Sequence, residues 1–160
     1  MVNPALYHVL ECVDFQHKFP HHFETVSKTV GVVHIVLCAS RIAPCFRRRA
    51  FWNSFQVGDP EFDPEAPPAK VLELGRWTDQ AKLPTVVASG IHSWNTRQVV
   101  FDEQCGGEWG QKVPLKTIEL ERCQGMPDGF TSMPGFDEKT RHHMIGNSFH
   151  VGVMKHIFRS

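Results

Sequence analysis

VVHIVL, residues 32–37, is the stretch that decides the fold of this 160-residue chain. Its β-branched residues favour a strand. Residues 18–30 are expected to form a helix before it, and Gly31 stands where a glycine commonly ends a helix. A second apolar run, LYHVLECV at 6–13, precedes that helix and is predicted to be a buried strand. Strand, helix and strand within about thirty residues are typical of the parallel sheet of an α/β protein.

Residues 50–55 (AFWNSF) predict a third strand, which the chain reaches through three consecutive arginines at 47–49. We therefore expect about three parallel or mixed strands within residues 6–55, joined through a right-handed strand–helix–strand connection. The chain then changes character, because DPEFDPEAPP at 59–68 holds four prolines and four acidic residues. Such a segment indicates a long loop.

The rest of the chain divides into short elements and then longer ones. A short helix is predicted within 69–77, and two short strands are predicted at 85–88 and 98–101. The expected C-terminal helices span residues 115–123, 137–145 and 149–158, with a glycine- and proline-rich loop at 125–136 between the first two. The apolar residues expected on one face of the last helix are Val151, Met154, Ile157 and Phe158.

The charge pattern excludes a protein that holds nucleic acid through bulk charge, because the formal net charge is zero. The charge is uneven along the chain: residues 1–56 carry +3, residues 57–115 carry −4 and residues 116–160 carry +1. Contact with nucleic acid must therefore depend on a local cluster, chiefly the three arginines at 47–49.

The five cysteines are scattered and form no C-x-x-C pair. We therefore expect reduced thiols rather than a disulfide framework, and no metal site. No run of 18 apolar residues is present, and residues 1–10 do not have the pattern of a secretory signal. The expected location is nuclear if the organism is eukaryotic and cytoplasmic otherwise, with no membrane partner.

Three segments of the chain carry a resemblance to a known family. LERCQGMPDGFT at 120–131, RHHMIGNSFHV at 141–151 and RRRAFWN at 47–53 resemble the ninth, tenth and eighth conserved motifs of DNA cytosine-5 methyltransferases. Their order and spacing also match, and the arginines followed by an aromatic-rich strand resemble the de novo branch of that family. The family's Glu-Asn-Val motif corresponds here to Glu11-Cys12-Val13, with cysteine in place of asparagine.

The resemblance implies catalytic roles for Glu11, Arg47 and Arg49. In the family the glutamate binds N3 and the exocyclic amine of a flipped cytosine, and a guanidinium can hold the cytosine O2 and a nearby phosphate at fixed angles. Alternation along an extended segment places Arg47 and Arg49 on one side. It leaves Arg48 on the other side, as a solvated or phosphate-binding residue. The substitution of Cys12 for asparagine alters the family's bracing of this site.

The Gly-Asn-Ser turn of the tenth motif implies a binding site for S-adenosylmethionine. Asn147, Ser148 and Phe149 are the residues expected to contact this cofactor, and Gly146 is expected to allow a tight turn close to it. A helix-connecting turn without a ligand is the alternative interpretation of the same residues.

The resemblance also implies an organisation for the whole chain. We expect the C-terminal half of a Rossmann-like methyltransferase sheet with a small irregular target-recognition insert and C-terminal helices. Residues 1–56 would form a partial catalytic domain, residues 57–115 the insert, and residues 116–160 the C-terminal catalytic-domain helices. The expected DNA-binding residues are Arg48, Ser93, Asn95 and Arg97, with Lys82 and Thr96 on the same edge.

The family's cofactor loop and its Pro-Cys nucleophile precede the Glu-Asn-Val motif, and only ten residues precede Glu11 here. Cys45 follows Pro44 but lies after that motif, so we interpret it as a structural residue. The expected function is that of a methyltransferase fragment that is inactive alone and pairs with DNA and with an N-terminal half or another methyltransferase subunit. The alternatives are a catalytically dead DNA-binding accessory module and a gene fragment without function.

Overall fold

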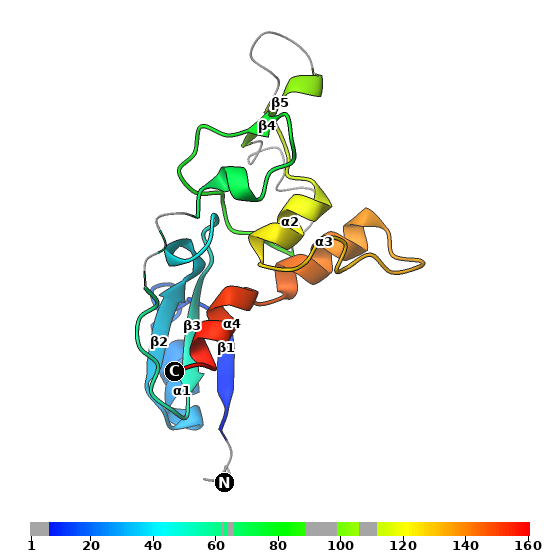
Figure 1. Ribbon diagram of the computed structural model, residues 1–160. Helices are drawn as coiled ribbons and strands as arrows, with labels where there is room; N and C mark the ends of the chain where they lie inside the picture. Colours follow the sequence, from blue (N-terminus) through cyan, green and yellow to red (C-terminus); the bar gives the residue numbers. More distant parts are fainter. Residues whose placement is uncertain (1–6, 62, 64–65, 89–98, 106–111) are drawn as a thin grey trace.

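The computed structural model describes residues 7–61, 63, 66–88, 99–105 and 112–160 (Figure 1). Within these residues the chain forms two small sheets and four α-helices. The strands are β1 (Val9–Val13), β2 (His34–Cys38), β3 (Arg48–Asn53), β4 (Arg76–Trp77), β5 (Val100–Asp102) and β6 (Lys112–Val113). The helices are α1 (Pro20–Val30), α2 (Thr117–Cys123), α3 (Glu138–Asn147) and α4 (Val151–Ile157).

The first sheet has the order β1-β3-β2, and β3 is antiparallel to both of its neighbours. The predicted strand–helix–strand unit and the α/β class are confirmed, but the prediction of parallel or mixed pairing was wrong. The connection through α1 leaves room for one strand between β1 and β2. A short connection after β2 reverses the chain, and an antiparallel strand can follow such a connection directly. β3 fills this central position.

The two faces of this sheet are covered by different helices, as Figure 1 shows for α1 and α4. On one face, Phe23 of α1 packs against Ala50 and Trp52 of β3, and the indole Nε1 of Trp52 donates a hydrogen bond of 2.9 Å to the hydroxyl of Ser27. On the other face, Phe51 packs against residues of α4. Successive residues of β3 therefore contribute to two separate apolar clusters, as the alternation of a strand requires.

The boundaries of α1 follow from its sequence. Pro20 occupies the first turn, where its missing N–H leaves no hydrogen bond unmade. Gly31 ends the helix with a φ of 75°, and its N–H donates to the carbonyl of Ser27 at 2.9 Å. This left-handed conformation favours glycine, so the predicted end of the helix is confirmed.

The apolar face predicted for α4 was partly wrong. Val153 and Ile157 are the buried residues of this helix, and Met154 packs against the same cluster. Val151 and Phe158 were assigned to that face, but Phe158 is 68% exposed and Val151 is also exposed. The helix is only seven residues long, so the single i, i+4 pair at 153 and 157 decides which side meets the sheet.

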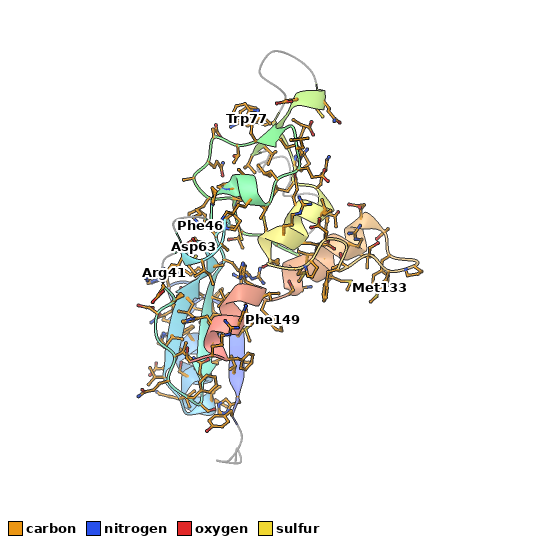
Figure 2. The ribbon with its side chains drawn as sticks, in the orientation of Figure 1. Arg41, Phe46, Asp63, Trp77, Met133 and Phe149 are labelled. Carbon is orange, nitrogen blue, oxygen red and sulfur yellow. The ribbon has the colours of Figure 1, made fainter. Side chains whose placement is uncertain are left out.

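The second sheet has the order β4-β5-β6 and lies at the opposite end of the molecule from α1 (Figure 1). Trp77 of β4 stacks on Phe101 of β5 with ring centroids 4.1 Å apart, and Figure 2 places Trp77 near the tip of this part.

The helix predicted within 69–77 is reduced to a 3-10 turn at Pro68–Lys70, because Gly75, with a φ of 77°, directs the chain into β4.

The strand predicted at 85–88 is absent from the described chain, where these residues have irregular backbone. Nearby, Leu83 makes one isolated bridge with Cys45. The apolar residues that suggested a strand are used for packing instead, since Val86 joins the core cluster that contains Leu83, Leu120 and Ile145.

That core cluster joins the insert to the C-terminal helices. Val100 and Leu115 pack with Leu120 of α2 and Ile145 of α3. Residues on both sides of position 115 therefore share one core, whereas the division into 1–56, 57–115 and 116–160 stays a prediction. Of the helices in the described residues, none has the length and apolar character to cross a membrane.

Candidate functional site

Glu11 and Arg49 lie side by side on the face of the first sheet that α4 covers. Glu11 pairs in register with Phe51, and Arg49 pairs with Val13, so the two charged residues are diagonal neighbours on β1 and β3. The carboxylate Oε1 of Glu11 lies 3.1 Å from Nε of Arg49, and the side chains are only 21% and 13% exposed. The family resemblance implied catalytic roles for both residues, and the structure brings them together.

The carboxylate of Glu11 is ion paired to Arg49 without a well-aligned hydrogen bond. Its buried Oε1 receives no hydrogen bond from any of the described residues, although it is within ion-pair distance of Arg49. Leaving a buried polar atom unbonded costs about 1–3 kcal/mol, more if it is charged. The pair therefore presents an acceptor and a guanidinium together, an arrangement that suits a ligand with complementary donors and acceptors.

Arg47 is held differently from Arg49. Its guanidinium donates to the carbonyls of Val86 at 3.1 Å and Gly146 at 3.3 Å, and also to the carbonyl of Ser148. The residue is only 4% exposed. Burial, and then the charge of Arg49, lowers the pKa of Arg47 to about 10, so the group stays protonated at neutral pH. The structure thus places Arg47 beside backbone carbonyls of the insert and of the α3–α4 turn.

Arg48 and Cys12 belong to the opposite face of the sheet. Nε of Arg48 lies 2.6 Å from Oδ2 of Asp14, and this hydrogen bond lowers the pKa of the Asp14 carboxyl. Arg48 is largely exposed there, as the predicted alternation requires. Cys12 packs against the α1-facing cluster with Ala50 and Trp52. The Cys12 thiol is therefore part of the packing between α1 and the sheet.

The residues of the Gly-Asn-Ser turn end α3 and precede α4. Asn147 is the last residue of α3, and its amide nitrogen lies 3.0 Å from Nε2 of His143. The hydroxyl of Ser148 donates to the carbonyl of Ile145 at 2.6 Å. Phe149 is 54% exposed at the junction of the two helices (Figure 2). The side chains of Asn147 and Phe149 are therefore exposed here, although the amide nitrogen of Asn147 is hydrogen bonded to His143 and the hydroxyl of Ser148 to Ile145.

A glycine is needed at position 146 for a reason other than the expected one. It lies inside α3, and its φ is not positive. A Cβ at this position would stand 2.2 Å from the nitrogen of Ala88 and 2.3 Å from the carbonyl carbon of Val87. The expectation that this glycine permits a tight turn near a ligand was wrong, because the space is taken by the insert's backbone.

His150 was missed by the sequence reasoning. It caps α4 by accepting a hydrogen bond of 3.2 Å from the N–H of Val153 to its Nδ1, and it is 5% exposed. Burial, and then the charge of Arg47, lowers its pKa to about 4. Its Nε2 has no hydrogen-bond partner among the described residues. The available signal was its position immediately before the last amphipathic helix.

The ninth-motif residues fold the loop at 125–136. Glu121 is fully buried and accepts from the N–H groups of Gly129 at 2.7 Å and Thr131 at 2.8 Å, while Arg141 of α3 lies 3.2 Å away. Burial raises the pKa of Glu121, but the hydrogen bonds lower it by more, so the net direction is downward. The loop that these contacts hold carries Met133 far from the first sheet (Figure 2).

A second buried ion-pair group was also missed. Arg76 of β4 donates to Glu119 of α2 at 2.7 Å and to Asp102 of β5 at 2.5 Å. Glu119 also accepts from the N–H of Lys116 at 2.8 Å and from that of Glu73 at 3.0 Å. Glu119 therefore connects α2 to the second sheet. The partners are far apart in the sequence, which carried no signal of this pairing.

Cys45 is not accessible for chemistry. The thiol is 1% exposed and donates to the carbonyl of Cys123 at 2.9 Å. The Cys45 thiol, together with burial, raises the pKa of Cys123 well above its usual value. Both thiols are placed for packing, in agreement with the interpretation of Cys45 as a structural residue.

The remaining predicted residues fall in two groups. Ser93, Asn95, Thr96 and Arg97 lie outside the described residues. Lys82, which was expected on the DNA-facing edge, instead donates to the carbonyls of Ala43 and Ala66, each at 2.9 Å. No three His, Cys, Asp or Glu side chains in the described part of the chain gather closely enough to hold a metal ion.

No family model and no curated protein matches this sequence. Solved structures do match. The methyltransferase EhMeth of Entamoeba histolytica gives a TM-score of 0.67 at 14% identity, over 99% of this chain and 63% of that one. The Dnmt2 methyltransferase of S. pombe gives 0.66 at 15% identity, over 95% and 63%. A DNMT2 variant of Spodoptera frugiperda gives 0.61 at 14% identity, over 96% and 65%.

These likenesses establish a shared fold. The chain spans about two thirds of the length of the first two structures at most, with 63% of each covered. The fold predicted from the sequence motifs is therefore confirmed, and it extends over nearly the whole of this chain.

Proposed function

We propose that this chain is the C-terminal portion of a DNA cytosine-5 methyltransferase, and that its Glu11–Arg49 pair holds the cytosine that receives the methyl group. The observation that supports this most is the Glu11–Arg49 ion pair, in which the buried Oε1 of Glu11 lies 3.1 Å from Nε of Arg49 without a well-aligned hydrogen bond. The fold shared with three methyltransferase structures supports the same assignment.

The chemistry of cytosine fits this pair. The exocyclic amine of cytosine is a donor, and the Glu11 carboxylate is an acceptor. A base enters such a site only after it leaves the duplex, which costs a few kcal/mol. The guanidinium of Arg49 would then donate to the ring carbonyl, and a charge-assisted bond of this kind is stronger than a neutral one.

The α3–α4 turn would hold part of the methyl donor, S-adenosylmethionine, which supplies the methyl group when bound. Asn147 offers an exposed amide and Phe149 an exposed ring, so these residues fit a ligand with polar and apolar parts. Ser148 fits less well, because its hydroxyl donates to Ile145 and its carbonyl accepts from Arg47. We therefore assign cofactor contact to Asn147 and Phe149.

A second candidate function is a DNA-binding accessory module without catalysis. The observation that favours it is Cys45, which belongs to the only Pro-Cys pair in the 160 residues and is buried. A cytosine-5 transfer needs an accessible thiolate to attack C6 of the base. We therefore expect the purified chain to transfer no labelled methyl group from S-adenosylmethionine to DNA, both as it is and with Cys45→Ser.

Binding separates the base-holding function from a general affinity for DNA. The probes are two labelled duplexes that are identical except for a cytosine or a thymine opposite an abasic site. The free energy needed to unstack an unpaired base is small. Thymine carries an acceptor oxygen at the position where cytosine carries its donor amine. A lost hydrogen bond to a charged group costs about 1.5–3 kcal/mol, so the cytosine duplex should bind about tenfold more tightly or better.

The matched variant is Glu11→Leu, which keeps a side chain of similar size and removes both carboxylate oxygens that could accept from the base. It should reduce the preference for the cytosine duplex to near one, as measured by fluorescence anisotropy, with little change in binding of the thymine duplex. Equal affinity of the unaltered chain for both duplexes would contradict the proposed function. Methyl transfer that is lost in Cys45→Ser would instead assign the nucleophile to Cys45.

A further inference from the structure

The Arg47 guanidinium joins three segments that are far apart in the sequence. It connects the residue before β3 to Val86 of the insert, to Gly146 in the last turn of α3 and to Ser148, which follows α3. We propose that Arg47 is a positioning residue, which fixes Arg49 relative to the insert and to the turn and does not itself touch the base. This inference rests on the proposed function of the Glu11–Arg49 pair.

The geometry of the contacts favours a positioning role. The bonds to carbonyl oxygens of Val86, Gly146 and Ser148 occupy both terminal nitrogens of Arg47, and the residue is nearly inaccessible. A guanidinium is planar and holds its acceptors at fixed angles, whereas an ammonium group fixes no such angles. The three carbonyls are therefore held in one arrangement with respect to β3.

Gly146 supports the contact between the insert and α3, which is the junction that Arg47 also holds. Its missing Cβ allows the backbone of Val87 and Ala88 to approach α3, where a methyl group would stand 2.2 Å from the Ala88 nitrogen. The insert segment is thus held both by the Arg47 side chain and by direct backbone packing. A change at either residue would alter the placement of the same segment.

The junction also acts on the base-holding pair through β3. Arg47 and Arg49 are two residues apart along an extended segment, which corresponds to about 7 Å. Both lie on the same side of it, and the positive charge of Arg49 contributes to the lowered pKa of Arg47. A displacement of the Arg47 backbone would therefore move Arg49 away from Glu11.

The test compares single substitutions by their effect on base preference. Arg47→Lys keeps the charge but cannot reproduce the forked contacts. It should reduce the ratio of affinities for the cytosine and thymine duplexes at least fivefold. The ratio is insensitive to any loss of folded protein, because unfolded chains lower both affinities equally. Arg41→Lys is the control, since Arg41 is an exposed surface residue 3.9 Å from Asp59 (Figure 2).

Gly146→Ala provides the second arm, because it changes the junction without removing a charge or a base contact. It should also lower the ratio, and combining it with Arg47→Lys should add little further loss. An unchanged ratio in either single variant would overturn the inference while leaving the proposed function intact. A ratio near one in the unaltered chain would overturn both, whereas loss in Arg49→Lys alone would overturn only the positioning role.

Discussion

The bonding partners and the pKa values of individual polar residues in this chain depend on how deeply each side chain is buried. Arg47 and Arg49 are separated by one residue, yet one is bound to backbone carbonyls and the other is paired with Glu11. Burial also sets the properties of His150, which lies beside Arg47 and whose pKa is lowered to about 4. Protonation of this ring in the folded state is opposed by burial and by a neighbouring positive charge.

This predicts a pH dependence of stability that is traceable to His150. The unfolded chain binds a proton near pH 6.5 and the folded chain only near pH 4, so stability is lost as the pH falls between these values. The loss amounts to about 3 kcal/mol in the free energy of unfolding. Urea denaturation at pH 6.5 and 4.5 measures most of it.

His150→Asn is the matched variant, because asparagine can still cap α4 but does not titrate. Burial also lowers the pKa of His142, which contributes in the same direction, so the difference between the two proteins isolates His150. A variant with the same pH dependence as the unaltered chain would assign the effect to other groups.

At the scale of elements, the short second sheet depends on the buried group formed by Arg76, Glu119 and Asp102. Arg76→Met leaves two carboxylates without their partner in a buried site, and breaking a buried pair in this way costs about 3–5 kcal/mol. The free energy of unfolding from urea denaturation should fall by that order. Lys112→Met removes the exposed pair with Asp79, 2.9 Å apart, and should cost less than about 1 kcal/mol. Similar losses in the two variants would contradict this assignment.

Elements whose own residues carry the pattern could be predicted from the sequence. α1 lies between Pro20 and Gly31, and β2 is β-branched, so both were found close to their observed bounds. The helix predicted within 69–77 is interrupted by Gly75 in its left-handed conformation. The strand predicted at 85–88 failed for a different reason, because its conformation is set by contacts with Arg47 and Gly146, which lie far away in the sequence. Tertiary partners override local propensity there.

The candidate site shows the same limit. Glu11 and Arg49 could be predicted to lie together because, by resemblance to the family, both would serve the same flipped base. The different environment of Arg47 could not be predicted, because alternation along a strand assigns a face and not a depth. The assignment to the de novo branch of the family stays a prediction.

At the scale of the whole molecule, the zero net charge limits any interaction with nucleic acid. Arg47 is buried, so only Arg48 and Arg49 of the basic cluster remain near the surface or the site. We expect two or three phosphate contacts. A plot of the logarithm of the binding constant against the logarithm of the salt concentration should then have a slope of about −2 to −3. Anisotropy titrations between about 50 and 200 mM salt measure this slope, and a much steeper one would indicate a larger basic surface.

The central place of β3 has a consequence for the time at which the site forms. β1 and β2 have no ladder with each other, since each pairs only with β3. A nascent chain therefore cannot complete this sheet until residue 53 has left the ribosome, even if β1 emerged much earlier. Glu11 is made before Arg49, but it can meet Arg49 only when the third strand inserts between the first two.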